Sequence, residues 1–82
     1  MKKTAITIHV PAIGQQHDFL IPSTMLIRDV LSLIVKILVS EYGVIDDDSD
    51  LMLFDEEDGK ALGLGHSLSQ LGLTDGARLV ML

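Results

Sequence analysis

Carboxylates are the chemistry-bearing residues that gather most closely in this sequence. Asp46, Asp48 and Asp50 occupy alternate positions, and Glu57 stands where a calcium loop of the EF-hand type places its bidentate glutamate. However, Leu51 stands where that loop needs a glycine, and the second half of the loop would have to be formed by the apolar run 51–54. We therefore predict no calcium site here.

Eight of the twelve carboxylates lie between positions 46 and 58, on either side of the run 51–54. They are Asp46, Asp47, Asp48, Asp50, Asp55, Glu56, Glu57 and Asp58. One interpretation is a pair of solvated loops that flank a strand. The other is an acidic docking surface for a basic partner. The candidates for that docking role are Asp46, Asp47, Asp48, Asp55, Glu56 and Glu57.

The sequence lacks the residue sets that nucleophilic and thiolate-based chemistry need. The chain contains no cysteine, which excludes a thiolate nucleophile, a thiolate metal site and a disulfide. His9, His17 and His66 fall in separate predicted elements, and no nucleophile is evidently paired with any of them. We predict no enzymatic activity, no metal site and no cofactor.

Composition and charge limit the kinds of partner. A net charge of −6 opposes binding to nucleic acid, because phosphates attract positive surfaces. The longest apolar stretch, residues 25–39, is interrupted by Arg28, Asp29 and Lys36 and is too short to span a bilayer. The start of the chain has no apolar h-region of a signal peptide. We expect a soluble, cytoplasmic protein with one domain over residues 1–82 and an aliphatic core.

Apolar periodicity predicts the elements that must position these side chains. Gly43 stands where a helix ends, and Ser23 or Thr24 can cap the start of that helix. The predicted order is strands 4–10 and 17–21, a helix from about 26 to 42, strands 51–54 and 61–64, a helical turn near 68–73 and a strand 78–82. We predict an α+β fold in which a mixed sheet of four to five strands packs on one helix.

The predicted helix is apolar over more than half of its circumference. Leu33 and Ile37 widen the apolar stripe on one side, and Val39 widens it on the other. A helix that packs on one sheet needs an apolar arc of little more than ~100°. Either a curved sheet and its loops cover these flanks, or the three side chains form an interface with a partner or a second copy.

The last strands have two faces by their period of two. If Leu51, Leu53, Leu79 and Met81 face the helix, the alternate residues face outward. These outward residues are Met52, Phe54, Val80 and Leu82. Exposed methionine, phenylalanine and valine side chains in one cluster, with carboxylates at the rim, have the physical properties of a recognition surface.

Two motifs carry a resemblance to a known family. One begins at Pro22 and runs through Ile27 to Leu33, and the other is the ending Leu68-Ser-Gln-Leu-Gly-Leu-Thr-Asp-Gly-Ala-Arg-Leu79. Both resemble the ubiquitin-like β-grasp domains, and more closely the small bacterial ubiquitin-like proteins of type VII secretion loci, the YukD and EsaB group. The likeness covers nearly the whole chain, at core and turn positions that specify a fold better than a function.

This resemblance implies a binding surface on the outer face of the sheet, where ubiquitin has its principal recognition patch. The matching positions are His9, Met52, Phe54, Val80 and Leu82. It further implies a non-covalent interaction module that serves a type VII secretion system as an accessory or regulatory component. The implied partners are cytoplasmic parts of the secretion machinery, including those of its membrane-embedded subunits.

The end of the sequence opposes two other functions of ubiquitin-like proteins, conjugation and sulfur transfer. Conjugated ubiquitins and the sulfur carriers ThiS and MoaD extend past the last strand to a flexible Gly-Gly carboxylate, whereas Leu82 lies within the predicted strand. We therefore expect neither conjugation nor sulfur transfer. A modifier or sulfur carrier remains one alternative, and a homo-oligomeric structural module joined through Leu33, Ile37 and Val39 is the other.

Overall fold

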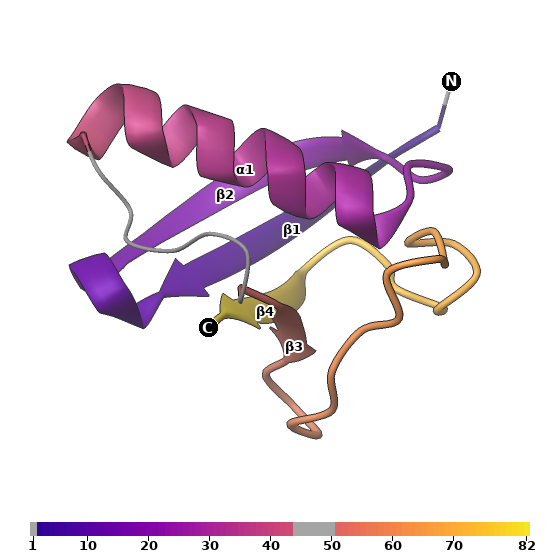
Figure 1. Cartoon of the computed structure of the whole chain (residues 1–82). Helices are drawn as coiled ribbons and strands as arrows, with labels where there is room; N and C mark the ends of the chain where they lie inside the picture. Colours follow the sequence, from indigo (N-terminus) through magenta and orange to yellow (C-terminus); the bar gives the residue numbers. More distant parts are fainter. Residues whose placement is uncertain (1, 44–50) are drawn as a thin grey trace.

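Strands and one long helix form two layers in the computed structural model, which describes residues 2–43 and 51–82 (Figure 1). The elements are β1 (Lys3–Val10), the 3-10 helix η1 (Pro11–Ile13), β2 (Gln15–Pro22), α1 (Ile27–Tyr42), β3 (Leu53–Asp55) and β4 (Ala77–Met81). Within that part of the chain, the sheet has four strands in the order β2-β1-β4-β3. This confirms the predicted α+β architecture of a mixed sheet on one helix.

Strand pairing makes the sheet mixed. β1 pairs antiparallel with β2, which follows it in the chain, and parallel with β4, which comes last. β4 then pairs antiparallel with β3. The two ends of the described chain therefore form the centre of the sheet, and the helix is the crossover that separates them.

The first hairpin is longer than the sequence predicts. Its connection is the single turn of η1, closed by Gly14, which has φ 62° and donates its backbone N–H to the Pro11 carbonyl at 3.1 Å. This positive φ suits glycine, which lacks a Cβ. β2 consequently starts at Gln15, two residues before the predicted strand 17–21, and its register with β1 runs without a break from Val10↔Gln15 to Lys3↔Pro22.

The start of α1 is capped differently from the prediction. Leu26 stands at the N-cap and makes no side-chain cap, so the expected roles of Ser23 and Thr24 are wrong. The carbonyl of His66 accepts the Ile27 N–H at 2.8 Å, and another residue of the same loop accepts the next N–H of the helix. A helix leaves its first N–H groups without intrahelical partners, and here a distant loop supplies them. At the other end, Gly43 confirms the predicted C-terminus: its φ is 89°.

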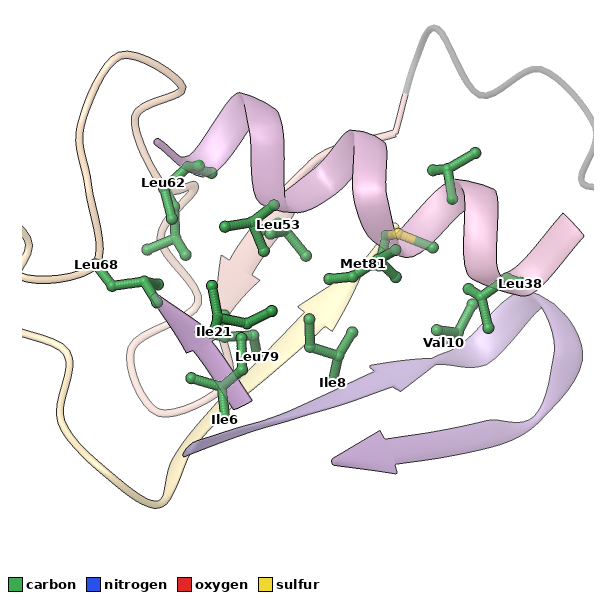
Figure 2. Packing of buried hydrophobic residues seen from close by; sticks show 14 residues of the cluster. Ile6, Ile8, Val10, Ile21, Leu38, Leu53, Leu62, Leu68, Leu79 and Met81 are labelled. Atoms are coloured by element: carbon green, nitrogen blue, oxygen red, sulfur yellow. The ribbon is translucent and has the colours of Figure 1, made fainter. Parts of the chain in front are cut away.

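The core lies between α1 and the inner face of the sheet, and it is aliphatic (Figure 2). Every second residue of β1 is buried, from Thr4 to Val10. The buried apolar side chains are Ile6, Ile8, Val10, Ile21, Ile27, Val30, Ile34, Val35, Leu38, Leu53, Leu62, Leu68, Leu79 and Met81. Fully burying one such side chain contributes about 1.5–3 kcal/mol, so this cluster is the main stabilising feature.

The predicted short strand at 61–64 does not form. Ala61 makes only an isolated bridge to Phe54, and the chain then continues as irregular structure toward residue 67. Gly63 and Gly65 interrupt the run, and glycine weakens strands because it loses more backbone entropy and has no side chain to pack. The Leu68 side chain, at the start of the predicted turn near 68–73, is nevertheless fully buried.

Candidate protein-binding surface

The outer face of the sheet presents a row of side chains from three adjacent strands. His9 on β1 lies directly opposite Val80 on β4, and Val80 lies opposite Phe54 on β3. Residues paired in register share one face of a sheet, so the three side chains stand side by side. They are each half-buried, which indicates that they pack on one another and still present a surface.

Met52 and Leu82 extend this row beyond the ends of β3 and β4. The Met52 N–H donates to the Leu82 carbonyl at 2.8 Å, and the Leu82 N–H donates to the Met52 carbonyl at 3.0 Å. Such a reciprocal pair places both side chains on the face that Phe54 and Val80 share. We call His9, Met52, Phe54, Val80 and Leu82 the outer patch. The structure brings together all five residues that the sequence nominates for the outer face.

The core determines which side chains form the outer patch. Leu53, Leu79 and Met81 alternate with the patch residues and are at most 1% exposed, because they face α1. A shift of one residue would move Leu53 to the solvent if it occurred in β3, and Leu79 and Met81 if it occurred in β4, so the register is strongly specified. The predicted alternation of β3 and β4 is therefore confirmed.

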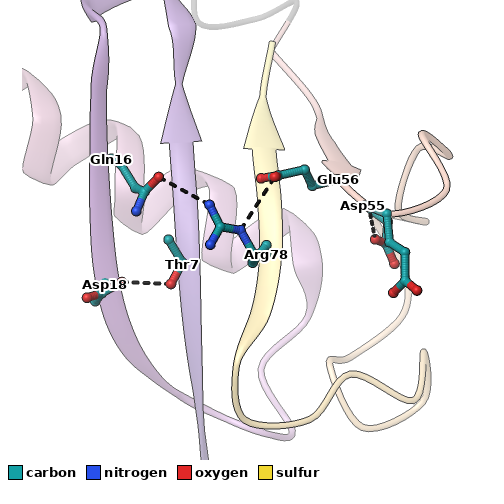
Figure 3. Close-up of polar contacts among 7 residues, drawn as sticks. Thr7, Gln16, Asp18, Asp55, Glu56 and Arg78 are labelled. Atoms are coloured by element: carbon teal, nitrogen blue, oxygen red, sulfur yellow. Dashed lines mark hydrogen bonds and ion pairs between the residues drawn. The ribbon is translucent and has the colours of Figure 1, made fainter.

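A band of polar residues lies on the outer face beside the outer patch, and Figure 3 shows the polar contacts within this band. Arg78 is the centre of this band: its Nε lies 3.4 Å from Glu56 Oε1, and its Nη2 donates to Gln16 Oε1 at 3.5 Å. On the two strands beyond, the Thr7 hydroxyl donates to Asp18 Oδ1 at 2.7 Å. We call Thr7, Gln16, Asp18, Glu56 and Arg78 the polar band. Since the side chains of Arg78 and Glu56 are 57% and 41% exposed, their ion pair contributes little stability and remains open to a partner.

Arg78 is not among the predicted site residues, although the alternation along β4 indicates that it belongs to the outer face. Arg78 and Val80 are two residues apart in the same strand, so they must share a face. The register of β1 confirms this, because Thr7 lies opposite Arg78 just as His9 lies opposite Val80. The guanidinium is therefore a neighbour of the outer patch and a donor for bidentate contacts with carboxylates.

The acidic candidates separate into different roles. Asp46, Asp47 and Asp48 lie outside the described residues. The Asp55 carboxylate accepts the Glu57 N–H at 2.8 Å and so holds the turn after β3. Glu56 pairs with Arg78 and joins the polar band, while Glu57 is exposed. Between this turn and the segment 71–78 lies an open pocket of about 540 Å³.

The helix flanks lie apart from the outer patch. Leu33 and Val39 are 37% and 44% exposed, and Ile37 is half-buried. Val39 lies on the side of α1 that also carries Tyr42, whose hydroxyl lies 3.0 Å from His17 Nε2 on β2. Leu33 and Ile37 lie on the opposite side. The helix-flank residues thus form two separate strips, on the two sides of α1 that the sequence predicts.

The remaining histidines are not gathered into a site. His17 contacts Tyr42 on the inner side of β2, and His66 serves α1 through its backbone carbonyl. In residues 2–43 and 51–82, no group of three or more histidine, aspartate or glutamate side chains could hold a metal ion. In the same residues, no helix is long and apolar enough to cross a membrane.

Comparison with known proteins yields structural neighbours only. No protein-family model and no curated protein matches the chain. Among solved structures, the EccD5 ubiquitin-like domain of Mycobacterium xenopi has a TM-score of 0.79 at 20% identity, over 100% of this chain and 94% of that domain.

Two further neighbours come from other organisms. The ubiquitin of Caldiarchaeum subterraneum has a TM-score of 0.73 at 20% identity, over 98% of this chain and 91% of that one. A ubiquitin-like domain of an Arabidopsis thaliana protein has a TM-score of 0.76 at 16% identity, over 100% of this chain and 78% of that one. Together with the mixed four-stranded sheet and its single helix, these likenesses show that the chain has the ubiquitin-like β-grasp fold.

Proposed function

We propose that this chain is a non-covalent protein-interaction module that binds its partner through the outer patch. The observation that carries the proposal is the alignment of His9, Val80 and Phe54 across three strands, extended by the Met52–Leu82 pair. A sheet is a rigid support, so these side chains are already positioned before a partner arrives. Binding then costs little conformational entropy.

The composition of the surface describes the partner. The centre of the outer patch is apolar and aromatic, which favours a partner with apolar side chains that exclude water there. Arg78 and Glu56 at its border present one charge of each sign, although the chain as a whole has a net charge of −6. A basic partner would therefore be attracted at long range, and Arg78 would select for a carboxylate at one point of contact.

The proposed role is that of an accessory or regulatory component of a type VII secretion system, acting in the cytoplasm. Two features support it: the resemblance of the motif from Pro22 and of the ending Leu68–Leu79 to the YukD and EsaB group, and the likeness of the fold to the EccD5 domain. The proposed partners are the cytoplasmic parts of the secretion machinery.

A homo-oligomeric module is the second candidate. It is favoured by the exposure of Leu33 and Val39 on α1, because exposed aliphatic side chains on a helix can pair with a second copy. In that case the oligomer would use the helix layer and leave the outer patch free.

Binding measurements with matched variants test the proposal. Purified cytoplasmic domains of the secretion machinery would be titrated against the wild-type chain, Phe54→Asp, Leu82→Asp and Leu64→Asp. Leu64 is 41% exposed and lies outside the outer patch, so it controls for an added charge on an exposed leucine. We expect the two patch variants to weaken binding about tenfold or more, and the control to change it less than about twofold. Equal loss in all three variants would contradict the proposal.

A further inference from the structure

The two edges of the sheet are treated differently by the fold. The β3 edge is covered by the segment that follows it: the Asp55 N–H donates to the Lys60 carbonyl at 2.9 Å, and the Leu62 N–H donates to the Leu53 carbonyl at 2.8 Å. At the opposite edge lies β2, a strand of eight residues. Within the described residues, no segment pairs with the side of β2 that points away from β1.

The register identifies the backbone groups at this edge. The Ser23 N–H donates to the Lys2 carbonyl, and hydrogen-bonded pairs alternate along an antiparallel ladder. The pairs Thr4↔Ile21, Ile6↔Phe19 and Ile8↔His17 are therefore the hydrogen-bonded ones. It follows that Gln16, Asp18 and Leu20 direct their N–H and C=O groups away from β1.

An edge of this kind is a template for another strand. Proteins commonly protect such edges with proline, charge or a short length. Here Pro22 marks one end and Asp18 carries the only charge, while Leu20 is 62% exposed on the outer face. On the inner side, the Tyr42 side chain extends from α1 to His17, and the two rings pack beside β2.

Self-pairing is the first occupant to consider, and the charge of Asp18 opposes it. A symmetric antiparallel pair of β2 strands that uses all three outward residues places Gln16 against Leu20 of the second copy. The same register places the two Asp18 side chains directly opposite each other. Like charges in directly opposed positions destabilise a strand pair. The edge is therefore poorly suited to a second copy of this chain.

We propose that the free edge of β2 binds an extended segment of a partner protein by strand addition. The segment pairs with Gln16, Asp18 and Leu20 through its backbone and lies antiparallel to β2. Residues that lie directly opposite each other in a strand pair share one face of the sheet. The segment therefore carries a basic residue opposite Asp18 and an apolar residue opposite Leu20 on the outer face. Figure 3 shows Asp18 and Gln16 on the outermost strand, with β1 and β4 between them and the acidic turn after β3. The proposal is independent of the outer patch.

A designed peptide provides the probe. A soluble synthetic peptide with the motif Val-Leu-Val-Lys-Val-Thr, read antiparallel to β2, places leucine opposite Leu20, lysine opposite Asp18 and threonine opposite Gln16. It would be titrated into the isotope-labelled full chain and followed by amide shifts and amide hydrogen exchange. We expect the amides of Gln16, Asp18 and Leu20 to shift and to exchange more slowly in the complex. A peptide with glutamate in place of the lysine should bind at least about tenfold more weakly.

Two variants give the decisive comparison. Leu20→Pro removes one outward N–H without breaking a bond to β1, and it should weaken binding about tenfold. Asp18→Lys should reverse the preference, so that the glutamate peptide binds better than the lysine peptide. Leu64→Asp, at an exposed position outside both β2 and the outer patch, should leave both affinities unchanged.

Several outcomes would overturn the proposal. These are the absence of binding at millimolar peptide, amide shifts confined to other strands, and equal binding of the lysine and glutamate peptides. Equal binding by Leu20→Pro would also overturn it. If Leu20→Pro is found to be unfolded by circular dichroism, the peptide preference of Asp18→Lys decides the question alone.

Discussion

Met52 and Leu82 exchange two backbone hydrogen bonds, of 2.8 and 3.0 Å, just beyond the ends of β3 and β4. This pair adds a second row beside that of His9, Val80 and Phe54, and so makes the outer patch a surface rather than a line. The backbone bonds do not depend on the identity of either side chain. Stability and binding can therefore be separated at Leu82.

Leu82→Asp should leave the fold intact while it weakens partner binding. The side chain is 57% exposed, and exposed substitutions usually change the free energy of unfolding by less than about 0.5 kcal/mol. Urea unfolding of the variant and the wild type measures this. A loss of several kcal/mol would show that Leu82 is a core residue and would invalidate it as a binding probe.

The ion pair of Arg78 and Glu56 should contribute little to stability. A double-mutant cycle with Arg78→Ala and Glu56→Ala should give a coupling energy of about 0.2–1 kcal/mol, because both side chains are largely exposed. The coupling should decrease at high salt, where surface charges are screened. A larger coupling that salt does not change would indicate a desolvated pair instead.

Thr4 and Ser23 form a buried polar pair whose removal should be strongly non-additive. Their hydroxyl oxygens lie 2.7 Å apart, and the residues are 3% and 4% exposed. Thr4→Val alone leaves the Ser23 hydroxyl without this partner and should cost about 1–3 kcal/mol. The double variant Thr4→Val with Ser23→Ala removes both polar groups and should be less destabilised than the sum of the two single changes. Additive losses in thermal or urea unfolding would contradict this interpretation.

Leu79 should be among the positions most sensitive to truncation. It is fully buried on the central strand β4, where Ile8 lies opposite it. Leu79→Ala should destabilise the chain by about 2–5 kcal/mol through lost burial and a cavity. The exposed Leu20→Ala is the matched control and should change stability by less than about 0.5 kcal/mol. Similar losses at both positions would mean that β2 is covered by other residues.

The free chain should be a monomer if the outer patch and the β2 edge serve other proteins. Sedimentation velocity over a range of concentrations would measure this for the wild type, Leu33→Asp and Val39→Asp. We expect one species with the mass of a single chain in all three. A wild-type dimer that either helix variant dissociates would instead support the homo-oligomeric module.

The sequence was most informative where burial alone decides the structure. Ile6, Ile8 and Val10 alternate strictly, and the helical spacing from Ile27 to Leu38 matches the buried face of α1. These patterns predict the elements because each is the shortest route by which a local segment can bury an apolar face. The outer positions of β3 and β4 followed from the same alternation.

The features that the sequence did not predict depend on distant parts of the chain. The cap of α1 comes from the carbonyls of Leu64 and His66, which no local pattern near Ser23 reveals. The pairing of Arg78 with Glu56 requires the register of two strands, and the open edge of β2 requires the order of all four. Asp46, Asp47 and Asp48 remain predictions as docking residues.

Site-specific photo-cross-linking would show which protein the outer patch contacts in the cell. A photoreactive amino acid would be placed at Leu82 in the outer patch or at Leu64 outside it, in the full chain expressed in its own cells, and the products would be identified by mass spectrometry. If the outer patch is the binding surface, we expect a cross-link from position 82 to a subunit of the secretion machinery, its loss when Phe54→Asp is added, and no such product from position 64. The same product from both positions, or from position 64 alone, would contradict it.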